Sequence, residues 1–149
     1  MTAAELVAKL NGETAVEALS ALCVLAKTKQ GRAEIEAAFS GRALLSALVK
    51  SEQPKVRKNA YRLIGALENE ADVPLLVSAL ETETTLFAVP SLLLSLGRLN
   101  AKDALFNYRL PVSESEAMDK HIAEITIAYE KAMQRFQTVP QSTLERLEA

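Results

Sequence analysis

The stretch PKVRKNAYRLIGALENEADVPLLVSALETETTLFAVPSLLLSLGRL, residues 54–99, contains two copies of one helical unit. The first copy ends in IGAL, residues 64–67, and the second ends in LGRL, residues 96–99. Gly65 and Gly97 hold the same place in these endings, and 97 − 65 gives a period of 32 residues. LSAL (residues 45–48) and VSAL (residues 77–80) precede them at the same offset. A fixed period of this length is typical of stacked helical repeats.

The composition of the 149 residues favours one helical domain. Apolar residues make up 49% of the chain, and Ala and Leu, both strong helix formers, dominate among them. The net charge of −2 argues against a strongly basic nucleic-acid-binding protein. No apolar run reaches the ~20 residues of a membrane-spanning helix, and no secretory signal is recognisable. We therefore expect a cytoplasmic protein that does not interact with a membrane.

Cys23 is the only cysteine, so no disulfide can form within the chain. Its sequence neighbours, residues 21–25 (ALCVL), are apolar. Reactive thiols need accessible, electropositive surroundings. We interpret Cys23 as a core residue and not as a nucleophile.

Capping and turn residues divide the chain into helices. Capping boxes at residues 2–5, 14–17 and 113–116 predict helix starts. Asp72 is expected to cap another helix, and Pro54 to lie in a first helical turn. Pro90 lacks the N–H that a helix interior needs, so we place it near a helix start. The predicted helices cover residues 2–11, 14–28, 32–39, 42–50, 54–67, 72–80, 86–99, 101–108 and 113–138.

The apolar spacing predicts one continuous core. Its central members are expected to be the buried side chains of Leu63, Ile64, Leu67, Leu92, Leu96 and Leu99. The predicted last helix carries a narrow heptad stripe at spacings of four and three residues: Met118, Ile122, Ile125, Tyr129, Ala132 and Phe136.

We predict that this stripe packs on the final repeat. The surface that it would cover contains Phe87, Leu94 and Phe106, and the side chains that it would leave in water are Asp119, Lys120, Glu124 and Lys131. An apolar surface of this kind must be covered or used. The alternative is that the stripe pairs between two chains and makes a dimer.

The order of predicted helices from residue 15 to residue 67 resembles an armadillo repeat array. AVEALSAL (residues 15–22) and VRKNAYRL (residues 56–63) fill matching places, 56 − 15 = 41 residues apart, within the ~40–47-residue period of this class. From Asp72 onward the unit is similar to a two-helix HEAT repeat. The resemblance implies an all-α, armadillo/HEAT-like right-handed α-α superhelix of about three units. We expect repeats over residues 1–110, a C-terminal heptad helix over 111–138 and a flexible tail over 139–149.

A second, narrower resemblance concerns function. PKVRKNA (residues 54–60), ETTLFAVPSLLL (residues 83–94) and KHI (residues 120–122) look like parts of the HEAT-like module that precedes the catalytic part of some bacterial RNA methyltransferases. The chain has no Gly-rich cofactor-binding turn and no Asn/Asp-Pro-Pro-Tyr-like string. The resemblance therefore implies an accessory module that binds neither the methyl donor nor the target base.

Few residues are candidates for catalysis. His121 is the sole histidine and lies among charged residues of the predicted last helix, so we interpret it as a surface side chain. The glycines are isolated and form no phosphate-binding loop. We expect no enzyme activity, no cofactor and no metal site.

Binding residues are better indicated. Lys55, Arg57, Lys58 and Arg62 form a basic cluster on one predicted helix, and in helical repeat proteins such helices line the concave surface. These cations are the candidate RNA-binding residues, although a plain solvated helix face is the alternative. One period later Phe87 and Leu94 take the places of Lys55 and Arg62, so we predict that they contact a protein partner. Two hypotheses follow: an accessory module of an RNA-modifying enzyme, attached to a catalytic domain or to RNA, and a free adaptor that binds a peptide or helix in its groove.

Overall fold

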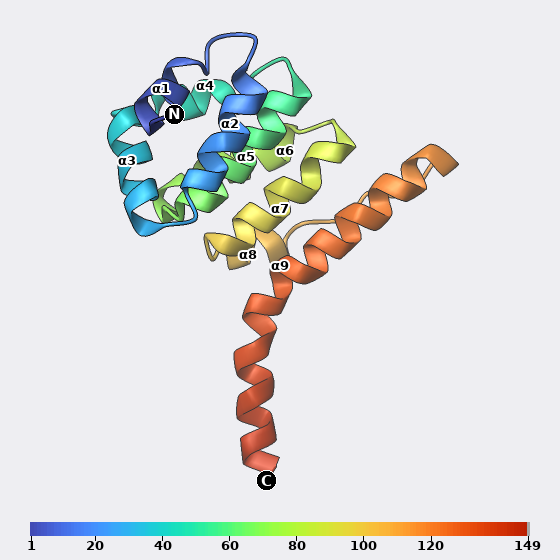
Figure 1. The fold of residues 1–149 in the computed structure, drawn as a ribbon. Coiled ribbons are helices and arrows are strands. Elements are labelled where there is room, and N and C mark those ends of the chain that lie inside the picture. Colours follow the sequence, from blue (N-terminus) through green and yellow to red (C-terminus); the bar gives the residue numbers. More distant parts are fainter. Residues whose placement is uncertain (149) are drawn as a thin grey trace.

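The computed structural model describes residues 1–148, with side chains described as far as Phe136. Within this range the chain is helical and contains no β-strand, so the predicted all-α fold class is confirmed (Figure 1). The helices are α1 (Ala3–Ala8), α2 (Ala15–Leu25), α3 (Lys29–Phe39), α4 (Ala43–Leu48), α5 (Pro54–Leu67), α6 (Val73–Thr82), α7 (Val89–Arg98), α8 (Lys102–Phe106) and α9 (Glu116–Glu148), with two 3₁₀ helices, η1 (Glu70–Asp72) and η2 (Leu86–Ala88).

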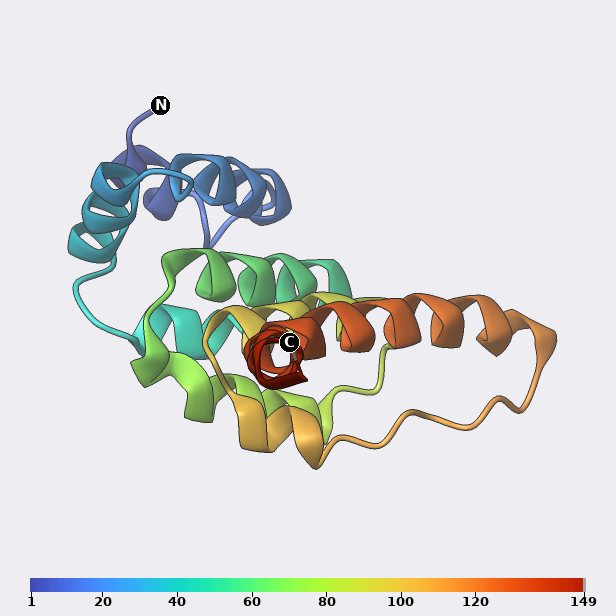
Figure 2. The same cartoon turned by 90° about the horizontal axis from the view of Figure 1, so that it is seen from below.

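Four helices lie side by side in one row, in the order α2, α5, α7 and α9 (Figures 1 and 2). The two glycines of the sequence period lie where this row is tightest. A Cβ built on Gly65 of α5 would lie 2.4 Å from Oγ of Ser95 in α7. A Cβ built on Gly97 of α7 would lie 3.0 Å from Cβ of Ala132 in α9. Each glycine therefore lets one helix approach the next at a distance that a side chain would prevent.

Shorter helices form a second layer behind the row. Helix α4 contacts α5, α6 contacts α7, and α8 contacts both α7 and α9. Figure 2 shows α4, α6 and α8 together below the row. At the N-terminal end α1 packs on α2 and α3. The opposite side of the row carries no second layer of helices from the described part of the chain.

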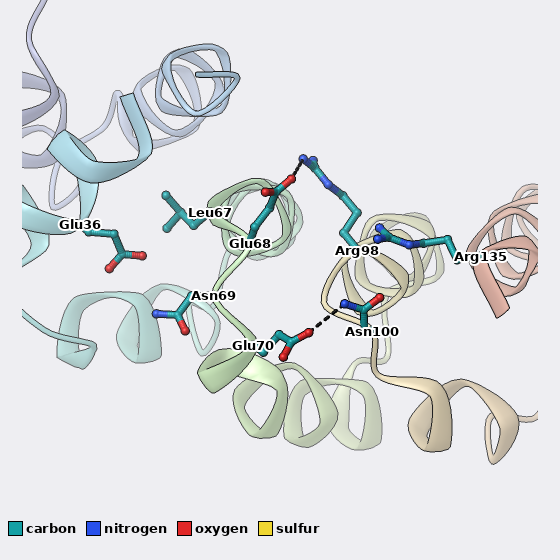
Figure 3. A pocket seen from close by; sticks show the side chains of 8 residues that line it. All are labelled: Glu36, Leu67, Glu68, Asn69, Glu70, Arg98, Asn100 and Arg135. Atoms are coloured by element: carbon teal, nitrogen blue, oxygen red, sulfur yellow. Dashed lines mark hydrogen bonds and ion pairs between the residues drawn. The ribbon is translucent and has the colours of Figure 1, made fainter. Parts of the chain in front are cut away.

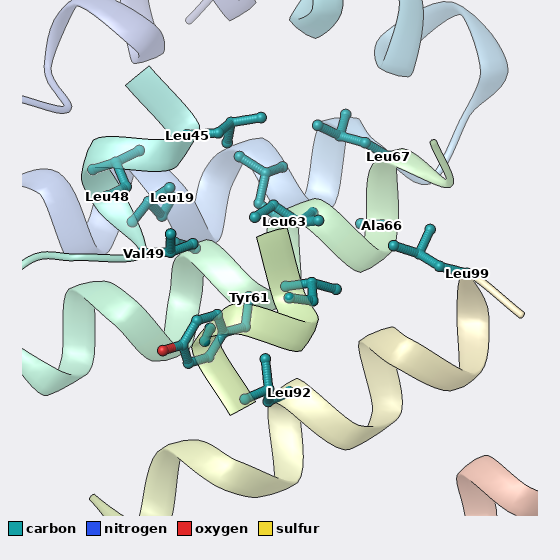
Figure 4. Packing of buried hydrophobic residues seen from close by; sticks show 14 of the residues in the cluster. Leu19, Leu45, Leu48, Val49, Tyr61, Leu63, Ala66, Leu67, Leu92 and Leu99 are labelled. Carbon is teal, nitrogen blue, oxygen red and sulfur yellow. The ribbon is translucent and has the colours of Figure 1, made fainter. Parts of the chain in front are cut away.

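The core lies between these two layers (Figure 4). All six leucine and isoleucine side chains that the spacing predicts as its centre belong to one buried cluster and are at most 5% exposed. In α5 and α7 the apolar residues recur with the 3.6-residue period of the helix, so they form one stripe along each helix. The prediction of one continuous core is confirmed.

Helix capping agrees with the sequence only in part. Thr2 and Glu5 form the predicted reciprocal capping box. Thr14 precedes α2 but makes no capping hydrogen bond with its side chain. The cap of α9 comes from Ser115, whose Oγ accepts a hydrogen bond of 3.3 Å from the N–H of Met118.

Asp72 precedes α6, as predicted, but does not cap it. Its carboxylate is 3% exposed and forms an ion pair with Arg42, in which Oδ1 lies 2.9 Å from Nε. Burial raises the pKa of Asp72, and the charge of Arg42 opposes this shift. Asp72 is the last residue of η1 and has αR backbone, with φ of −86° and ψ of −2°, whereas a capping residue typically has extended backbone, so its side chain pairs with Arg42 instead.

Pro90 and Pro140 lie at different places in their helices, one in the first turn and one in the interior. Pro90 lies in the first turn of α7, as predicted, because the helix begins at Val89 after the separate 3₁₀ turn of η2. Residues 138–140 do not end the last helix, although the sequence predicts that they do. Helix α9 runs across Pro140 to Glu148, so the predicted tail over residues 139–148 has helical backbone, and Ala149 lies outside the described residues. Figure 1 shows that α9 changes direction along its length.

The stripe of α9 faces the row. Ile125 and Ala132 are buried, and the other stripe members are half-buried. The charged side chains predicted to remain in water, Asp119, Lys120, Glu124 and Lys131, are exposed. Phe106 is not covered, contrary to expectation: it is 54% exposed, with Nζ of Lys102 5.5 Å from its ring centroid. Tyr108 takes its place against α9, 6.0 Å from the ring of Tyr129.

Candidate functional site

A groove of about 580 Å³ crosses the open side of the row. Its lining comes from α2 and the residues just after it, from α5, from α7 and from α9. We call it the cationic groove, and its lining residues are Ser20, Cys23, Val24, Ala26, Lys27, Arg62, Ala66, Ser91, Leu94, Ser95, Gly97, Arg98, Lys131, Ala132 and Arg135. Helices far apart in sequence therefore build one surface.

The charge of this groove has one sign. Its five charged lining residues are Lys27, Arg62, Arg98, Lys131 and Arg135, and all five are exposed. Among the described residues no carboxylate lines it. The groove therefore concentrates positive potential on a chain whose net charge is −2.

The cations recur at regular intervals along the chain. Lys27, Arg62, Arg98 and Arg135 are separated by 35, 36 and 37 residues, from 62 − 27, 98 − 62 and 135 − 98. Each of the four helices of the row thereby contributes one member of the set, with Lys27 lying two residues after the end of α2. These intervals are longer than the 32-residue repeat, so the cations hold different positions along their helices.

Apolar side chains form the floor between the cations. Leu94 and Cys23 are half-buried there, and Val24 is 60% exposed. An exposed valine beside five cations leaves a surface that is both apolar and positively charged. Such a surface complements a segment that combines carboxylates with apolar side chains.

Arg62 is held in place by a buried amide. Asn59 is 5% exposed, and its Nδ2 donates a hydrogen bond of 3.3 Å to the carbonyl oxygen of Val16 in α2. Its Oδ1 accepts a hydrogen bond of 3.0 Å from Nη1 of Arg62. The asparagine thus joins α2 to α5 and orients the guanidinium at the groove. Arg62 has further N–H donors that can serve a ligand.

Arg98 lies between the cationic groove and a second cavity. This second cavity, the polar cleft, has a volume of about 700 Å³ and is lined by Glu36, Leu67, Glu68, Asn69, Glu70, Arg98, Asn100 and Arg135 (Figure 3). Nη2 of Arg98 lies 3.3 Å from Oε1 of Glu68. Nδ2 of Asn100 donates 2.8 Å to Oε1 of Glu70. Arg98 and Arg135 line both cavities, so they are shared by the two.

Cys23 is not arranged as a nucleophile. Burial raises the pKa of its thiol, and the nearby charges of Arg62 and Arg98 only oppose that shift. A thiol with a raised pKa carries little thiolate at neutral pH. Its half-buried side chain packs against the core and contributes to the groove floor.

The structure divides the basic cluster that the sequence indicates. Arg62 lines the groove, Lys55 is exposed and Lys58 is half-exposed. Arg57 is instead bound to Glu83: its Nε and Nη2 donate hydrogen bonds of 2.9 and 3.0 Å to the two carboxylate oxygens. The carboxylate of Glu83 is 1% exposed and also accepts 2.7 Å from the Tyr61 hydroxyl. This network fixes the loop before η2 to α5.

The two predicted partner-contacting residues are separated as well. Leu94 lines the cationic groove. Phe87 is half-buried on η2, which packs against α5, α7 and α9. His121, predicted as a surface residue, is half-buried, and its Nδ1 is enclosed with no hydrogen-bond partner among the described residues.

Comparison with protein-family models, with curated proteins and with solved structures found no significant match. In the described part of the chain, no group of His, Cys, Asp and Glu side chains could hold a metal ion. None of the described helices combines the length and the apolar character needed to cross a membrane.

Proposed function

We propose that this chain is a non-catalytic binding module of the armadillo/HEAT-like class, a right-handed superhelix that holds an acidic segment of a protein partner in its cationic groove. The observation that carries the proposal is the convergence of five exposed cations, from α5, α7, α9 and the turn after α2, on one groove that no carboxylate of the described residues lines. Isolated surface cations need no ligand. A set that converges on one cavity provides a row of sites for a ligand with several negative charges.

The spacing of the helices fits an extended acidic segment. Neighbouring packed helices lie about 8–10 Å apart. A segment in the polyproline II conformation has three residues per turn and advances about 3.1 Å per residue. Carboxylates at every third residue of such a segment would therefore lie on one side, about 9 Å apart, and face successive helices. Apolar residues between them would contact Val24 and Leu94 on the floor.

A synthetic peptide tests this function directly. The probe is an extended peptide of about twelve residues, enough to cross four helices at this spacing, with Glu at every third position and Ala or Val between. We expect binding that weakens with salt and disappears when the glutamates become glutamines. Arg62→Glu and Lys131→Glu should each weaken binding by about tenfold or more, because a charge-assisted hydrogen bond contributes about 1.5–3 kcal/mol.

The matched control is Lys9→Glu, which makes the same charge change on an exposed residue at the end of α1, outside the groove. It should leave peptide binding unchanged. Equal losses for Lys9→Glu and Lys131→Glu would show that net charge, and not the groove, attracts the peptide. Absence of binding at low salt would reject the function.

A second function has one observation in its favour. Lys55 and Lys58 lie on α5 next to Arg62 and present their charges on the same helix face. This face extends the positive surface away from the groove and supports an accessory module of an RNA-modifying enzyme. No aromatic side chain lines the groove among the described residues, so base stacking does not contribute there.

Single-stranded RNA separates the two functions. If RNA is the ligand, Lys55→Glu with Lys58→Glu should abolish its binding, and the affinity should fall steeply with salt. If the ligand is an acidic protein segment, this double variant should leave peptide binding intact. A methyltransferase-like catalytic segment in the same gene would favour the RNA function.

A further inference from the structure

We propose that Glu68 is an internal competitor of the cationic groove: its carboxylate occupies Arg98 until a carboxylate of the bound segment replaces it. This inference rests on the proposed function and adds how the affinity of the same site is set. It assigns a role to a residue that lies outside the groove lining. The ion pair between Glu68 and Arg98 is the observation on which it depends.

The backbone brings Glu68 to this position. It ends α5 in the left-handed region, with φ of 56°, and directs its carboxylate toward the last residue of α7. Figure 3 shows the Glu68 side chain meeting Arg98 across the polar cleft. A second cation, Nη2 of Arg32, lies 3.9 Å from the other carboxylate oxygen of Glu68. Glu68 is therefore the acidic side chain paired with a cation of the groove.

The pair is weak enough to exchange. Both side chains are about half exposed, 49% for Glu68 and 47% for Arg98. The single contact of 3.3 Å is longer than a strong charge-assisted hydrogen bond. Exposed pairs of this kind contribute little to stability. A partner carboxylate in the groove can take over Arg98, because a long arginine side chain reaches either cavity by rotating its own torsions.

A matched pair of variants isolates this role. Glu68→Gln removes the competing charge from Arg98. Glu70→Gln removes a carboxylate from the same cleft, but that carboxylate is bonded to Asn100 and not to Arg98. With the Glu-containing peptide as probe, we expect Glu68→Gln to tighten binding about two- to fivefold, because the peptide no longer has to break an exposed ion pair. Glu70→Gln should change binding much less.

A double-mutant cycle tests whether Glu68 acts through Arg98. In an Arg98→Ala background the gain from Glu68→Gln should vanish, because no arginine remains to be released. If the gain persists there, Glu68 acts through general repulsion of the peptide, and the inference is wrong. Equal gains from Glu68→Gln and Glu70→Gln would also overturn it.

The possible failures are distinguishable. If the peptide binds in the groove but Glu68→Gln does not tighten it, the competitor is rejected and the binding function stands. If the peptide does not bind the wild-type protein or either variant, the proposed function fails first. Thermal unfolding of each variant confirms that the comparison is made between folded proteins.

Discussion

Ser95 of α7 donates a buried hydrogen bond of 2.7 Å to the carbonyl oxygen of Tyr61 in α5. The serine is 3% exposed, and Gly65 lies one turn after Tyr61 on the same helix. A carbonyl inside a helix can accept a second hydrogen bond only if its partner comes very close. The absence of a side chain at Gly65 allows this approach, so the glycine and the serine are parts of one contact.

Gly65→Ala should therefore destabilise the protein. The new Cβ would lie 2.4 Å from Oγ and 2.9 Å from Cα of Ser95. Because Cα cannot rotate away, α5 and α7 must separate, and we expect a loss of about 1–3 kcal/mol, as for overpacked cores. Urea denaturation measures it. Gly12→Ala is the control, because a Cβ there meets only Lys9 O at 3.6 Å; equal effects at both positions would contradict the close contact.

Leucines at the centre of the core should be costly to truncate. Leu63 and Leu96 are both 0% exposed. We expect Leu63→Ala and Leu96→Ala each to lower the free energy of unfolding by about 2–5 kcal/mol. Ile127→Ala, on a side chain that is 65% exposed, should cost less than about 0.5 kcal/mol. A loss below half a kilocalorie at both leucines would mean that the helices are packed in another register.

The buried carboxylate of Glu83 should make stability depend on acid. Burial raises its pKa, but hydrogen bonds from Arg57, Tyr61 and the N–H of Thr85 outweigh burial, and the pKa is lowered overall. A lowered pKa in the folded state contributes stability above the ordinary glutamate pKa, about 4.3. That contribution is lost as the pH falls through the lowered value.

Glu83→Gln should thus cost about 3–5 kcal/mol at neutral pH, because Arg57 loses its buried partner. The difference in unfolding free energy between the wild type and this variant should narrow as the pH falls through the lowered pKa of Glu83. Glu81→Gln, on an exposed residue of α6, is the control and should follow the wild type. A difference between wild type and Glu83→Gln that stays constant with pH would contradict the assigned pKa shift.

Removing residues 113–149 should expose the surface of α7 that α9 covers. The truncated protein is expected to bind an apolar dye and to aggregate, because Ala132 and Ile125 no longer shield the row. The intact protein should remain monomeric in light scattering or sedimentation. If the intact protein is a dimer and truncation yields a soluble monomer without dye binding, the heptad stripe pairs between chains instead.

Much of the fold was predictable because it depends on periodicity. The 32-residue repeat brings Gly65 and Gly97 to equivalent close contacts, and the 3.6-residue spacing of the leucines identifies the core. These signals are local, and each turn of a helix repeats the same apolar spacing. Pro90 was also correctly placed, since the steric rule for proline near a helix start is strong.

The site was less predictable because its residues are joined only by packing. Arg57 looks like a member of a basic cluster until Glu83, 26 residues away, is found beside it. Arg98 and Arg135 stand alone in the sequence and enter the groove only when α7 and α9 lie side by side. The intervals of 35, 36 and 37 residues between successive groove cations could have indicated the site. They differ from the 32-residue repeat, so a search at the repeat period does not find them.

If Glu68 competes for Arg98 as proposed, its left-handed backbone sets folding stability against binding. One period later the equivalent position is Asn100, with φ of 60°, and asparagine tolerates this conformation. A glutamate does not, and strain of about 1–2 kcal/mol attaches to such a residue. Glycine at position 68 would relieve that strain and strengthen the domain, yet it would delete the carboxylate that occupies Arg98. Selection for thermal robustness alone would therefore be expected to replace Glu68, whereas the proposed competition for Arg98 would retain it.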